Sequence, residues 1–340
     1  MPARFNINEF LSLPYTLFDV RSPIEYDKGH IPNAINLPLF TNEERALVGK
    51  AYHQKGRDEA VKIGLEKVSS KLTSFIESVQ KKAKDKNIRI HCWRGGLRSG
   101  NMGWLLQTAG YNVHILEGGY KSYRQYVQKF FENPFQLIII GGMTGSGKTE
   151  ILNNLQTAGH QIIDLESIAN HKGSVFGHLG QAEQPSTEHF ENLLFFELSK
   201  LKSDLPIWVE SESMAIGRIY IPKPFFQQMQ ESIMIYLERS REQRAKRLVA
   251  EYASFEKELL KESVERISRR VGSDNAKIII NLIENDKFYE AIYIILKYYD
   301  KLYRKDKCVR NAKKIISLKI DSLTNNEILD SMLSLANKKN

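Results

Sequence analysis

The stretch that most constrains the fold is "FQLIIIGGMTGSGKTEIL" at residues 135–152. Its apolar run, residues 136–140, predicts a buried strand, and the residues after the glycine-rich turn predict a helix. The turn has the spacing G-x-x-x-x-G-K-[ST], and a strand before it and a helix after it are the context that a phosphate-binding loop requires. The sequence therefore predicts an α/β domain with a phosphate site in the middle of the chain.

The members of this loop are Gly142, Gly145, Ser146, Gly147, Lys148 and Thr149. The glycines let backbone N–H groups turn toward a phosphate, the Lys148 ammonium adds positive charge, and the Thr149 hydroxyl could hold Mg²⁺. Such a loop recognises a di- or triphosphate but not the group attached to it. No N-K-x-D element for guanine occurs, so a GTPase of the usual kind is not expected. ATP, GTP and a non-nucleotide diphosphate all stay open.

Acidic residues at the ends of two further apolar runs are the candidate metal partners of this loop. Glu210 follows "LPIWV", with Glu212 as an alternative, and Asp164 follows "QII". A carboxylate at a strand end beside the loop could hold Mg²⁺ against the phosphates. Acidic strand ends are common, so a role without metal is the competing interpretation. No metal site is fixed by the sequence, and no CxxC pair suggests zinc.

The second chemical feature is "IRIHCWRGGLRSG" at residues 88–100, where Cys92 ends an apolar run before a turn and a predicted helix. A sulfur in this position lies among the N-terminal amides of the helix, and Arg94 and Arg98 add positive charge, so the thiolate is favoured. Gly95 and Gly96 permit a tight turn that directs successive N–H groups at one anion. We expect a nucleophilic thiol over an anion-binding loop; a buried structural cysteine is the alternative.

The spacing of this loop is compatible with two chemistries. Five residues separate Cys92 from Arg98, and a histidine precedes the cysteine, which is the spacing of cysteine-dependent phosphatases. The thiolate could attack phosphorus, or it could accept sulfur or selenium as a persulfide or selenylsulfide. A phosphatase also needs a general acid, which the sequence does not identify. The other cysteine, Cys308, lacks the glycines and the preceding strand and is interpreted as incidental.

The pattern of apolar runs predicts two α/β domains and a helical region. We expect a parallel-sheet domain at residues 1–130, the phosphate-loop domain at 131–240, and at 241–340 a helical region that packs on it or extends it. The expected strands of the first domain are residues 17–20, 88–92 and 113–116, with helices near 60–82 and 99–108. Strands of the second are expected at 136–140 and within "HQIIDLE", "LPIWVES" and "SIMIYLER", and the pattern is helical beyond Ser240.

Composition excludes several classes of protein. The 340 residues are 42% hydrophobic, enough for packed cores, but no apolar run is long enough to span a membrane and the first residues lack a signal-peptide pattern. Two cysteines cannot form a disulfide framework, so we expect a cytoplasmic protein with reduced thiols and no membrane partner. The formal net charge of +9 favours a polyanionic partner, although charge runs such as "RSREQRAKR" are usually solvated helix faces.

Motifs on both sides of Cys92 resemble the rhodanese family. They are "FDVRSPIEYDKGHIPNAINLP", "CWRGGLRS" and "LEGGYKSYR", although the cysteine loop has one residue more than in most rhodaneses. With "NEERALVGKAYHQKGRDEAVKIG", "DLESIANHKGSVFGHLG" and "IWVESESMAIG", the chain resembles the tRNA 2-selenouridine synthase family over about residues 8–310. The resemblance implies an N-terminal rhodanese-like domain, a second domain of the P-loop NTPase type and a helical C-terminal region.

The resemblance also implies an activity, namely a transferase that replaces the 2-thio sulfur of the tRNA wobble uridine with selenium. Selenophosphate and geranyl diphosphate are the implied co-substrates, because a geranyl group is first attached to the sulfur and selenium then replaces it. Cys92 would carry selenium as a selanylcysteine, and Arg94 and Arg98 would hold selenophosphate. The phosphate loop would hold the diphosphate, with Mg²⁺ as a candidate ion. Implied partners are tRNA and an enzyme that supplies selenophosphate.

Two other functions are compatible with the same motifs. One is a sulfurtransferase or cysteine-dependent phosphatase joined to a small-molecule kinase-like domain, which would act without tRNA. The other is a regulatory RNA-binding module with an inactive rhodanese-like domain. The intact Cys92, both arginines and the complete phosphate loop argue against this last interpretation, because an inactive domain has no chemical need for them.

Overall fold

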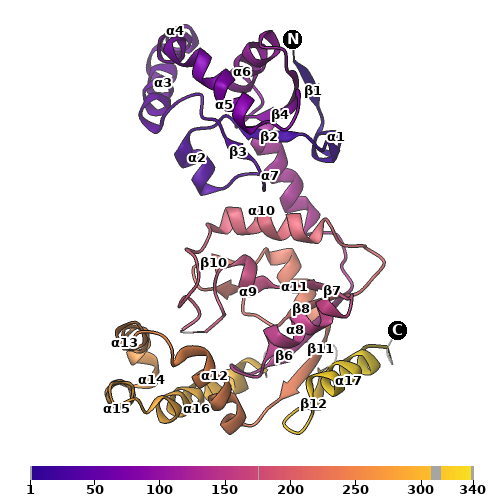
Figure 1. Ribbon diagram of the computed structural model, residues 1–340, viewed down its shortest axis with the longest axis vertical. Helices are drawn as coiled ribbons and strands as arrows, with labels where there is room; N and C mark the ends of the chain where they lie inside the picture. Colours follow the sequence, from indigo (N-terminus) through magenta and orange to yellow (C-terminus); the bar gives the residue numbers. More distant parts are fainter. Residues whose placement is uncertain (1, 175, 308–314, 338–340) are drawn as a thin grey trace. The chain divides into compact units, whose positions relative to one another are not determined.

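The computed structural model describes residues 2–174, 176–307 and 315–337 of the chain. The Cα positions group into two compact units, Met1–Phe130 with Glu191–Phe196 and Phe131–Phe190 with Glu197–Asn340. Each unit contains a five-stranded parallel sheet with helices packed against it (Figure 1). The predicted α/β fold class, with two parallel-sheet parts and mainly helical structure toward the C-terminus, is therefore confirmed.

The sheet of the first unit has the strand order β1-β5-β4-β2-β3, and all of its strand pairs are parallel. Ile88 and Ile90 on one face of β4 and His91 on the other are all 0% exposed, as expected for a parallel sheet that is covered on both faces. The three strands predicted for this region are present. The strands are β1 (Ala3–Phe5), β2 (Thr16–Asp19), β3 (Ile35–Asn36), β4 (Asn87–His91) and β5 (Asn112–Leu116).

A short 3-10 turn that begins with two serines divides one stretch of the first unit that was predicted to be a single helix. The prediction of one helix near residues 60–82 is wrong, because the 3-10 turn Ser69–Lys71 divides this stretch in two. Serine bonds locally to the backbone, and here Ser69 Oγ donates to the Glu66 carbonyl at 3.0 Å. The helices are α1 (Ile7–Ser12), α2 (Pro23–Lys28), α3 (Asn42–Lys55), α4 (Arg57–Val68), α5 (Leu72–Lys82), α6 (Leu97–Thr108) and α7 (Gly119–Phe130).

The sheet of the second unit has the order β12-β11-β6-β8-β7, again with parallel pairs throughout. The strand that leads into the phosphate loop, β6, lies at the centre between β11 and β8. The carboxyl ends of β6 and β8 therefore meet at one edge, where ligands of open parallel sheets bind. The strands are β6 (Leu137–Gly142), β7 (Gln161–Ile163), β8 (Ile207–Glu210), β11 (Ile233–Glu238) and β12 (Ile315–Lys319), with a separate hairpin of β9 (Ala215–Ile216) and β10 (Ile219–Tyr220).

Strand β12 corrects the prediction that the chain is helical beyond Ser240. It pairs in parallel with β11, with Ile316 opposite Ile235, and forms one edge of the second sheet. The stretch "IISLK" exposes Ser317 and Lys319 on alternate positions, which is typical of a partly covered edge strand and not of a helix. The strand has only five residues and follows several long charged helices. The helical pattern of the preceding segment therefore led to the prediction of helix here as well.

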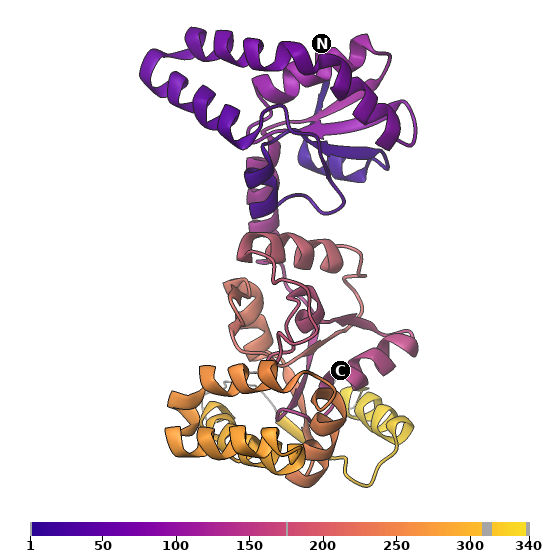
Figure 2. The ribbon, with the colours of Figure 1, turned by 60° about the vertical axis from the view of Figure 1, so that its left-hand side comes forward.

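Between β11 and β12 the chain forms a layer of helices that lie side by side (Figure 2). Its core is aliphatic and aromatic, with Leu248, Tyr252, Ile279 and Ile295 all buried. The helices of the second unit are α8 (Lys148–Thr157), α9 (Leu165–Ile168), α11 (Lys223–Glu231), α12 (Arg241–Tyr252), α13 (Lys257–Arg266), α14 (Ser268–Val271), α15 (Ser273–Glu284), α16 (Phe288–Lys307) and α17 (Asn325–Asn337), while α10 (Thr187–Leu198) has residues in both units.

Among the described residues, no helix combines the length and the apolar composition needed to cross a membrane. The 20-residue helix α16 carries Lys, Asp and Glu side chains along its length. Cys308 lies outside the described residues.

Candidate active sites

Cys92 lies directly after the central strand β4 and shortly before α6. Its side chain is 3% exposed, and its Sγ lies 3.3 Å from the hydroxyl oxygen of Ser99 in the first turn of α6. Ser99 Oγ also donates to the Gly96 carbonyl at 3.3 Å. The sulfur is therefore held at the amino end of a helix, where the helix dipole favours an anion.

Two glycines from different segments pack against each other at this loop. Gly119 has φ +60°, and a Cβ there would lie 2.3 Å from the Cys92 carbonyl oxygen and 2.4 Å from the Gly95 nitrogen. Gly95 has φ +65°, and its Cβ would lie 2.6 Å from the Leu116 carbonyl oxygen. Tyr120, next to Gly119, donates its N–H to the Cys92 carbonyl at 2.8 Å. Because only glycine permits this approach, the conformation of the cysteine loop depends on the "EGGY" segment.

The cysteine loop presents several free amides. Among the described residues, no acceptor is found for the backbone N–H groups of residues 94–98. Arg94 and Gly96 are both exposed beside these amides. Successive N–H groups at a helix N-terminus, with a cation next to them, are the arrangement that is typical of anion-binding loops.

Arg98 is bound to another side chain. Its Nη1 donates to Oε2 of Glu25 on α2 at 2.6 Å, and its Nη2 donates to Oε1 at 3.3 Å. Burial alone would raise the pKa of the Glu25 carboxyl, but the hydrogen bonds and charge of Arg98 lower it below its usual value. Arg98 therefore contributes a positioned cation whose charge is partly balanced, and Glu25 is a site residue that sequence reasoning missed.

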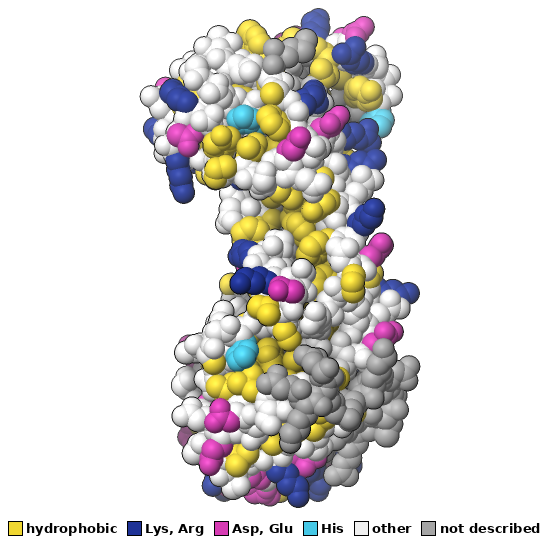
Figure 3. Space-filling model, turned by 90° about the vertical axis from the view of Figure 1, so that its right-hand side faces the viewer, with side chains coloured by type: hydrophobic (Ala, Val, Ile, Leu, Met, Phe, Trp, Pro, Cys, Tyr) yellow, Lys and Arg dark blue, Asp and Glu magenta, His cyan; other side chains and the backbone are white. Residues whose placement is uncertain are grey.

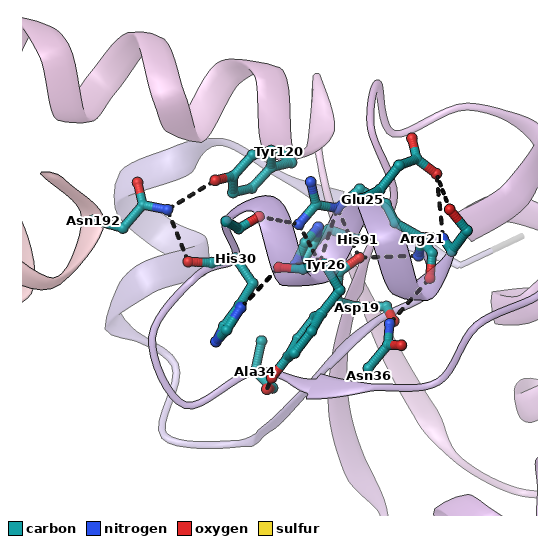
Figure 4. Close-up of polar contacts among 12 residues, drawn as sticks. Asp19, Arg21, Glu25, Tyr26, His30, Ala34, Asn36, His91, Tyr120 and Asn192 are labelled. Atoms are coloured by element: carbon teal, nitrogen blue, oxygen red, sulfur yellow. Dashed lines mark hydrogen bonds and ion pairs between the residues drawn. The ribbon is translucent and has the colours of Figure 1, made fainter. Parts of the chain in front are cut away.

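A buried ionic network lies beside β4, the strand that ends at His91 just before Cys92 (Figure 4). The Arg21 guanidinium donates to the Asp19 carboxylate at 2.6 Å and lies over the Tyr120 ring, 3.8 Å from its centre. Oδ2 of Asp19 also lies 3.7 Å from Nε2 of His91. Burial lowers the pKa of His91 to about 4, so its imidazole is neutral near pH 7. The residue before the cysteine is thus a neutral, enclosed ring.

Asn192 of α10 extends this network within the first unit (Figure 4). Its amide nitrogen donates to the Tyr120 hydroxyl and to the His30 carbonyl, each at 2.8 Å. Its carbonyl oxygen accepts a hydrogen bond from Arg124. Since the backbone of Tyr120 bonds to Cys92, the fully buried Asn192 fixes the ring of a residue that holds the cysteine loop.

The phosphate loop joins β6 to α8 and has the left-handed backbone that its glycines permit. Gly145 and Gly147 have φ +79° and +92°. A Cβ on Gly145 would lie 3.1 Å from the Arg244 carbonyl oxygen, and one on Gly147 would lie 3.0 Å from Nη2 of Arg247. Helix α12 therefore packs directly on the loop and brings the guanidinium of Arg247 to it.

A pocket of about 640 Å³ opens at the phosphate loop. Residues 144–149 form one side of it, so that Ser146, Lys148 and Thr149 line the pocket together. Arg247 and Lys172 also line the pocket, each paired with a glutamate of the same lining, Glu150 and Glu251. Leu248, Ala250 and Tyr252 of α12 add apolar surface. The volume is that of a small-molecule site and exceeds what a phosphate group alone fills.

Three glutamates gather beside Thr149. The Thr149 hydroxyl donates to Glu166 at 3.2 Å, and the Glu166 N–H donates to Oε1 of Glu210 at 2.9 Å. Both Glu166 and Glu212 come within 2.9 Å of the position that a Cβ on Gly173 would take. Burial, together with the Glu212 charge, raises the pKa of Glu166 to about 8, and burial with Glu166 nearby raises the pKa of Glu210. With a pKa of about 8, Glu166 is mostly protonated near pH 7 when no cation is bound.

Known protein families match both halves of the chain. A family model described as "tRNA 2-selenouridine synthase AAA domain" matches residues 135–328, and a rhodanese-like domain model matches residues 7–126. A tRNA 2-selenouridine synthase of Sulfurovum sp. (strain NBC37-1) is 34% identical, covering 88% of this chain and 90% of the relative. The chain belongs to the tRNA 2-selenouridine synthase family. Two further relatives of that name are 34% identical (Shewanella denitrificans, 87% of this chain and 90% of the relative) and 35% identical (Shewanella sediminis, 87% and 89%).

Membership of the tRNA 2-selenouridine synthase family makes this chain an enzyme, and its two loops are the candidate sites. The residues predicted for each loop lie together in their own unit. Asp164, predicted as a metal partner, instead accepts the Ser167 N–H at 2.8 Å and caps α9. The acid that meets Thr149 is Glu166, two residues later, which sequence reasoning missed. The one sequence feature that could have indicated Glu166 is its position in the first turn of the helix that follows β7.

The oxygen atoms beside the phosphate loop decide whether a metal ion could bind there. Within the described ranges, no group of three or more His, Cys, Asp or Glu side chains is arranged to hold a metal ion by itself. Mg²⁺ is usually bound by one or two carboxylates together with substrate phosphates and water. The hydroxyl of Thr149 and the carboxylate of Glu166 fit that kind of shared site. Glu210 also fits it, because its Oε2 is buried next to them and has no hydrogen-bond partner among the described residues.

Proposed function

We propose that this protein replaces the 2-thio sulfur of the wobble uridine of tRNA with selenium, by way of a geranylated 2-thiouridine. One observation carries the proposal: a chain that matches tRNA 2-selenouridine synthases over most of its length keeps both an intact cysteine loop and an intact phosphate loop. Geranyl diphosphate and selenophosphate are the two co-substrates. The first would react at the phosphate loop and the second at the cysteine loop.

The geranyl step makes the sulfur a leaving group. The uridine sulfur attacks the carbon that bears the diphosphate, a C–S bond forms, the C–O bond breaks and inorganic pyrophosphate leaves. The negative charge that develops on the diphosphate is what the amides of the phosphate loop and the Lys148 ammonium would stabilise. Arg247, which is paired with Glu150, lines the same pocket. Nucleotide hydrolysis is not required for this step.

Mg²⁺ would share the charge of the diphosphate. Thr149 and Glu166 are the residues that would hold it, together with phosphate oxygens. When bound, the ion neutralises the leaving group as a Lewis acid. A cation at this position also favours the ionised form of Glu166, whose pKa burial raises to about 8.

The selenium step belongs to the cysteine loop. Overall, a C–Se bond forms at C2 of the uridine, the C–S bond breaks and geranylthiol leaves, while water takes the phosphoryl group of selenophosphate as phosphate. Cys92 is the residue that would act on selenophosphate: its thiolate attacks phosphorus, an S–P bond forms, and the P–Se bond breaks to release hydrogen selenide for C2 of the uridine, after which water cleaves the S–P bond. The amides of residues 94–98 with Arg94 would hold the anion. Arg98, bound to Glu25, would act at the edge of this anion site.

The partner is tRNA, and we place the reaction in the cytoplasm. The net charge of +9 supports binding to the phosphate backbone of RNA. On the face shown in Figure 3, Lys and Arg side chains are scattered, with Asp and Glu side chains among them. The RNA would therefore be bound through several separate cations. An enzyme that makes selenophosphate would supply the cysteine loop.

The proposal is tested by the wobble nucleosides of cells with and without this protein. Mass spectrometry should find 2-selenouridine only when the protein is present. Purified protein with geranyl diphosphate should convert 2-thiouridine tRNA to its geranylated form, and selenophosphate should then yield the selenated form. Unchanged 2-selenouridine levels in cells without the protein would contradict the proposed function.

A further inference from the structure

A buried arginine of α12, Arg244, contacts the phosphate loop without lining its pocket. Its Nη1 donates to the Thr144 carbonyl at 3.2 Å. Its own carbonyl oxygen lies 3.1 Å from the position that a Cβ on Gly145 would take. The residue is only 2% exposed, and burial of a charge is costly unless the charge is paired and hydrogen-bonded. The contacts of Arg244 therefore indicate what this cation does at the loop.

The charge of Arg244 is balanced by Asp300 of α16. Nη2 of Arg244 lies 3.0 Å from Oδ1 and 2.9 Å from Oδ2 of this carboxylate, which is 5% exposed. Arg241 donates from Nε to Oδ2 of Asp300 at 2.8 Å, so the carboxylate binds two guanidinium groups. Nε of Arg244 donates to the carbonyl of Arg239, directly after β11, at 3.2 Å. Asp300 and the Arg239 carbonyl thus fix the guanidinium that reaches the Thr144 carbonyl.

The hydrogen bond to the Thr144 carbonyl determines the direction of the N–H group that follows it. The carbonyl and the N–H of a trans peptide unit point in opposite directions, because the unit is planar. No cis peptide occurs in the described part of the chain. When the Thr144 carbonyl faces Arg244, the Gly145 N–H therefore points away from Arg244. Since Gly145 lines the pocket and Arg244 does not, this N–H is directed to the side on which a phosphate would lie.

Gly145 by itself does not select this orientation of the peptide unit. Its φ is +79°, but glycine adopts positive and negative φ with similar ease, so the unit between Thr144 and Gly145 could also turn over. The carbonyl oxygen would then face the pocket, and its partial negative charge would repel a phosphate. The bond from Arg244 exists only in the first orientation, and such a bond from an ionised donor is stronger than one between neutral groups.

We infer that Arg244 is a positioning residue of the phosphate loop: held by Asp300, it fixes the Thr144 carbonyl and so keeps the Gly145 N–H directed at the phosphate of the ligand. The inference rests on the part of the proposed function that places a diphosphate on this loop, and it holds whatever group the diphosphate carries. Arg244 does not touch the ligand. Asp300 makes α16, the last helix of the helical layer, part of the support of the site.

The test is calorimetric titration of the full-length protein with inorganic pyrophosphate. Arg244→Lys keeps the positive charge, but one ammonium nitrogen cannot replace a guanidinium that reaches Thr144, Asp300 and the Arg239 carbonyl together. We expect the affinity for pyrophosphate to fall about tenfold, which corresponds to the loss of one hydrogen bond to a charged group. In geranyl transfer, the KM for geranyl diphosphate should rise by a similar factor while kcat stays near the wild-type value, because the N–H binds substrate and transition state alike.

A second variant leaves Arg244 itself intact. Asp300→Asn offers the guanidinium one oxygen in place of two, so the affinity for pyrophosphate should fall in the same direction by a smaller factor. This variant decides the question if Arg244→Lys does not fold. Urea denaturation shows which variants are folded at the temperature of the titration.

The matched control is Arg241→Lys. Arg241 binds the same oxygen of Asp300, but among the described residues no hydrogen bond joins its side chain to the phosphate loop. Its substitution should therefore lower stability and leave the affinity for pyrophosphate within about twofold of the wild type. Hydrogen–deuterium exchange of residues 142–149 gives a second readout: exchange should be faster in Arg244→Lys and unchanged in Arg241→Lys.

The possible failures are distinguishable. If Arg244→Lys and Asp300→Asn both keep the wild-type affinity for pyrophosphate, the loop does not need this support and the inference is wrong. If Arg241→Lys loses as much affinity as Arg244→Lys, the ion pairs only support the fold and the inference is again wrong. If the variants differ as expected but the wild type transfers no geranyl group to tRNA, the proposed function fails while the inference stands.

Discussion

Arg98 and Glu25 form a two-point ion pair, with Nη1 2.6 Å from Oε2 and Nη2 3.3 Å from Oε1. The arginine is the last residue of the cysteine loop motif, and the glutamate lies on α2, 73 positions earlier in the chain. Glu25 also accepts the backbone N–H and the hydroxyl of Ser22 at the start of α2. The pair therefore joins the helix that begins at the cysteine loop to a second helix and fixes the guanidinium in one orientation.

The variant Arg98→Lys should distinguish the contribution of the fixed guanidinium orientation from the contribution of the positive charge. Lysine keeps the charge but cannot bind both oxygens of Glu25, so we expect a loss of about 1 kcal/mol in the free energy of unfolding and a clear rise in the KM for selenophosphate. Urea denaturation and selenation kinetics measure the two effects. Arg45→Lys is the control, because Arg45 is 51% exposed and 3.7 Å from the same glutamate. It should change stability by less than about 0.5 kcal/mol. If Arg98→Lys and Arg45→Lys had the same stability and the same KM for selenophosphate, the proposed role of the Arg98–Glu25 ion pair would be wrong.

Cys92→Ser should abolish selenium incorporation. The serine hydroxyl is close in size but is a much weaker nucleophile than a thiolate, and the side chain is only 3% exposed, so neither fold nor RNA surface should change. Geranylation of the tRNA and affinity for tRNA should stay near wild-type levels. Both are measured on the same substrate, by mass spectrometry of nucleosides and by filter binding. If Cys92→Ser incorporated selenium at the wild-type rate, the role proposed for Cys92 would be wrong.

Gly119→Ala should damage the cysteine loop without touching its chemical groups. The added Cβ would meet the Cys92 carbonyl at 2.3 Å and the Gly95 nitrogen at 2.4 Å, so the loop has to move. We expect loss of selenation and destabilisation by more than about 2 kcal/mol. The control is Gly110→Ala, which has φ +86° but nothing within 4 Å of its Cβ. It should cost only about 1 kcal/mol from backbone strain and keep selenation. A Gly119 variant no worse than this control would show that the close approach does not matter.

The sequence was sufficient for those features of the fold that depend on local pattern. The strand, glycine turn and helix around Lys148, and the same order around Cys92, each lie within about twenty residues, so periodicity and glycine spacing reveal them. Glu25 and Asn192 could not be found in this way. Both reach their sites only because the first sheet and α10 bring distant segments together. Glu166 was overlooked because Asp164, the acid directly after the strand, caps a helix.

Lys148→Ala should impair geranyl transfer before it affects selenation. The ammonium lies on the phosphate loop in the pocket, where it stabilises the charge of the departing diphosphate. We expect a fall of at least about a hundredfold in the geranylation rate. Selenation of tRNA that has already been geranylated should stay near normal. Supplying geranylated tRNA separates the two steps directly. If geranylation persisted and only selenation failed, the division of labour between the two loops would be wrong.

His91 should make stability depend on pH between about 6.5 and 4. Burial lowers the pKa of this imidazole from 6.5 to about 4 in the folded protein, while the unfolded chain titrates near the ordinary value. As pH falls through this window, the unfolded state takes up a proton that the folded state does not. Stability from this group is therefore complete above about pH 6.5 and is lost toward pH 4, by on the order of 3 kcal/mol at about 1.4 kcal/mol for each pKa unit.

The contribution of His91 can be isolated from the other groups that titrate in this window. His30, His114 and His171 also have lowered pKa values, chiefly through burial, and add losses of the same sign. His91→Phe removes one titrating group and keeps a ring at a site that is 0% exposed. The difference in unfolding free energy between wild type and variant, measured by urea denaturation at several pH values, should shift by on the order of 3 kcal/mol against the wild type between pH 7 and pH 4. A constant difference would mean that the pKa of His91 is not lowered in the folded protein.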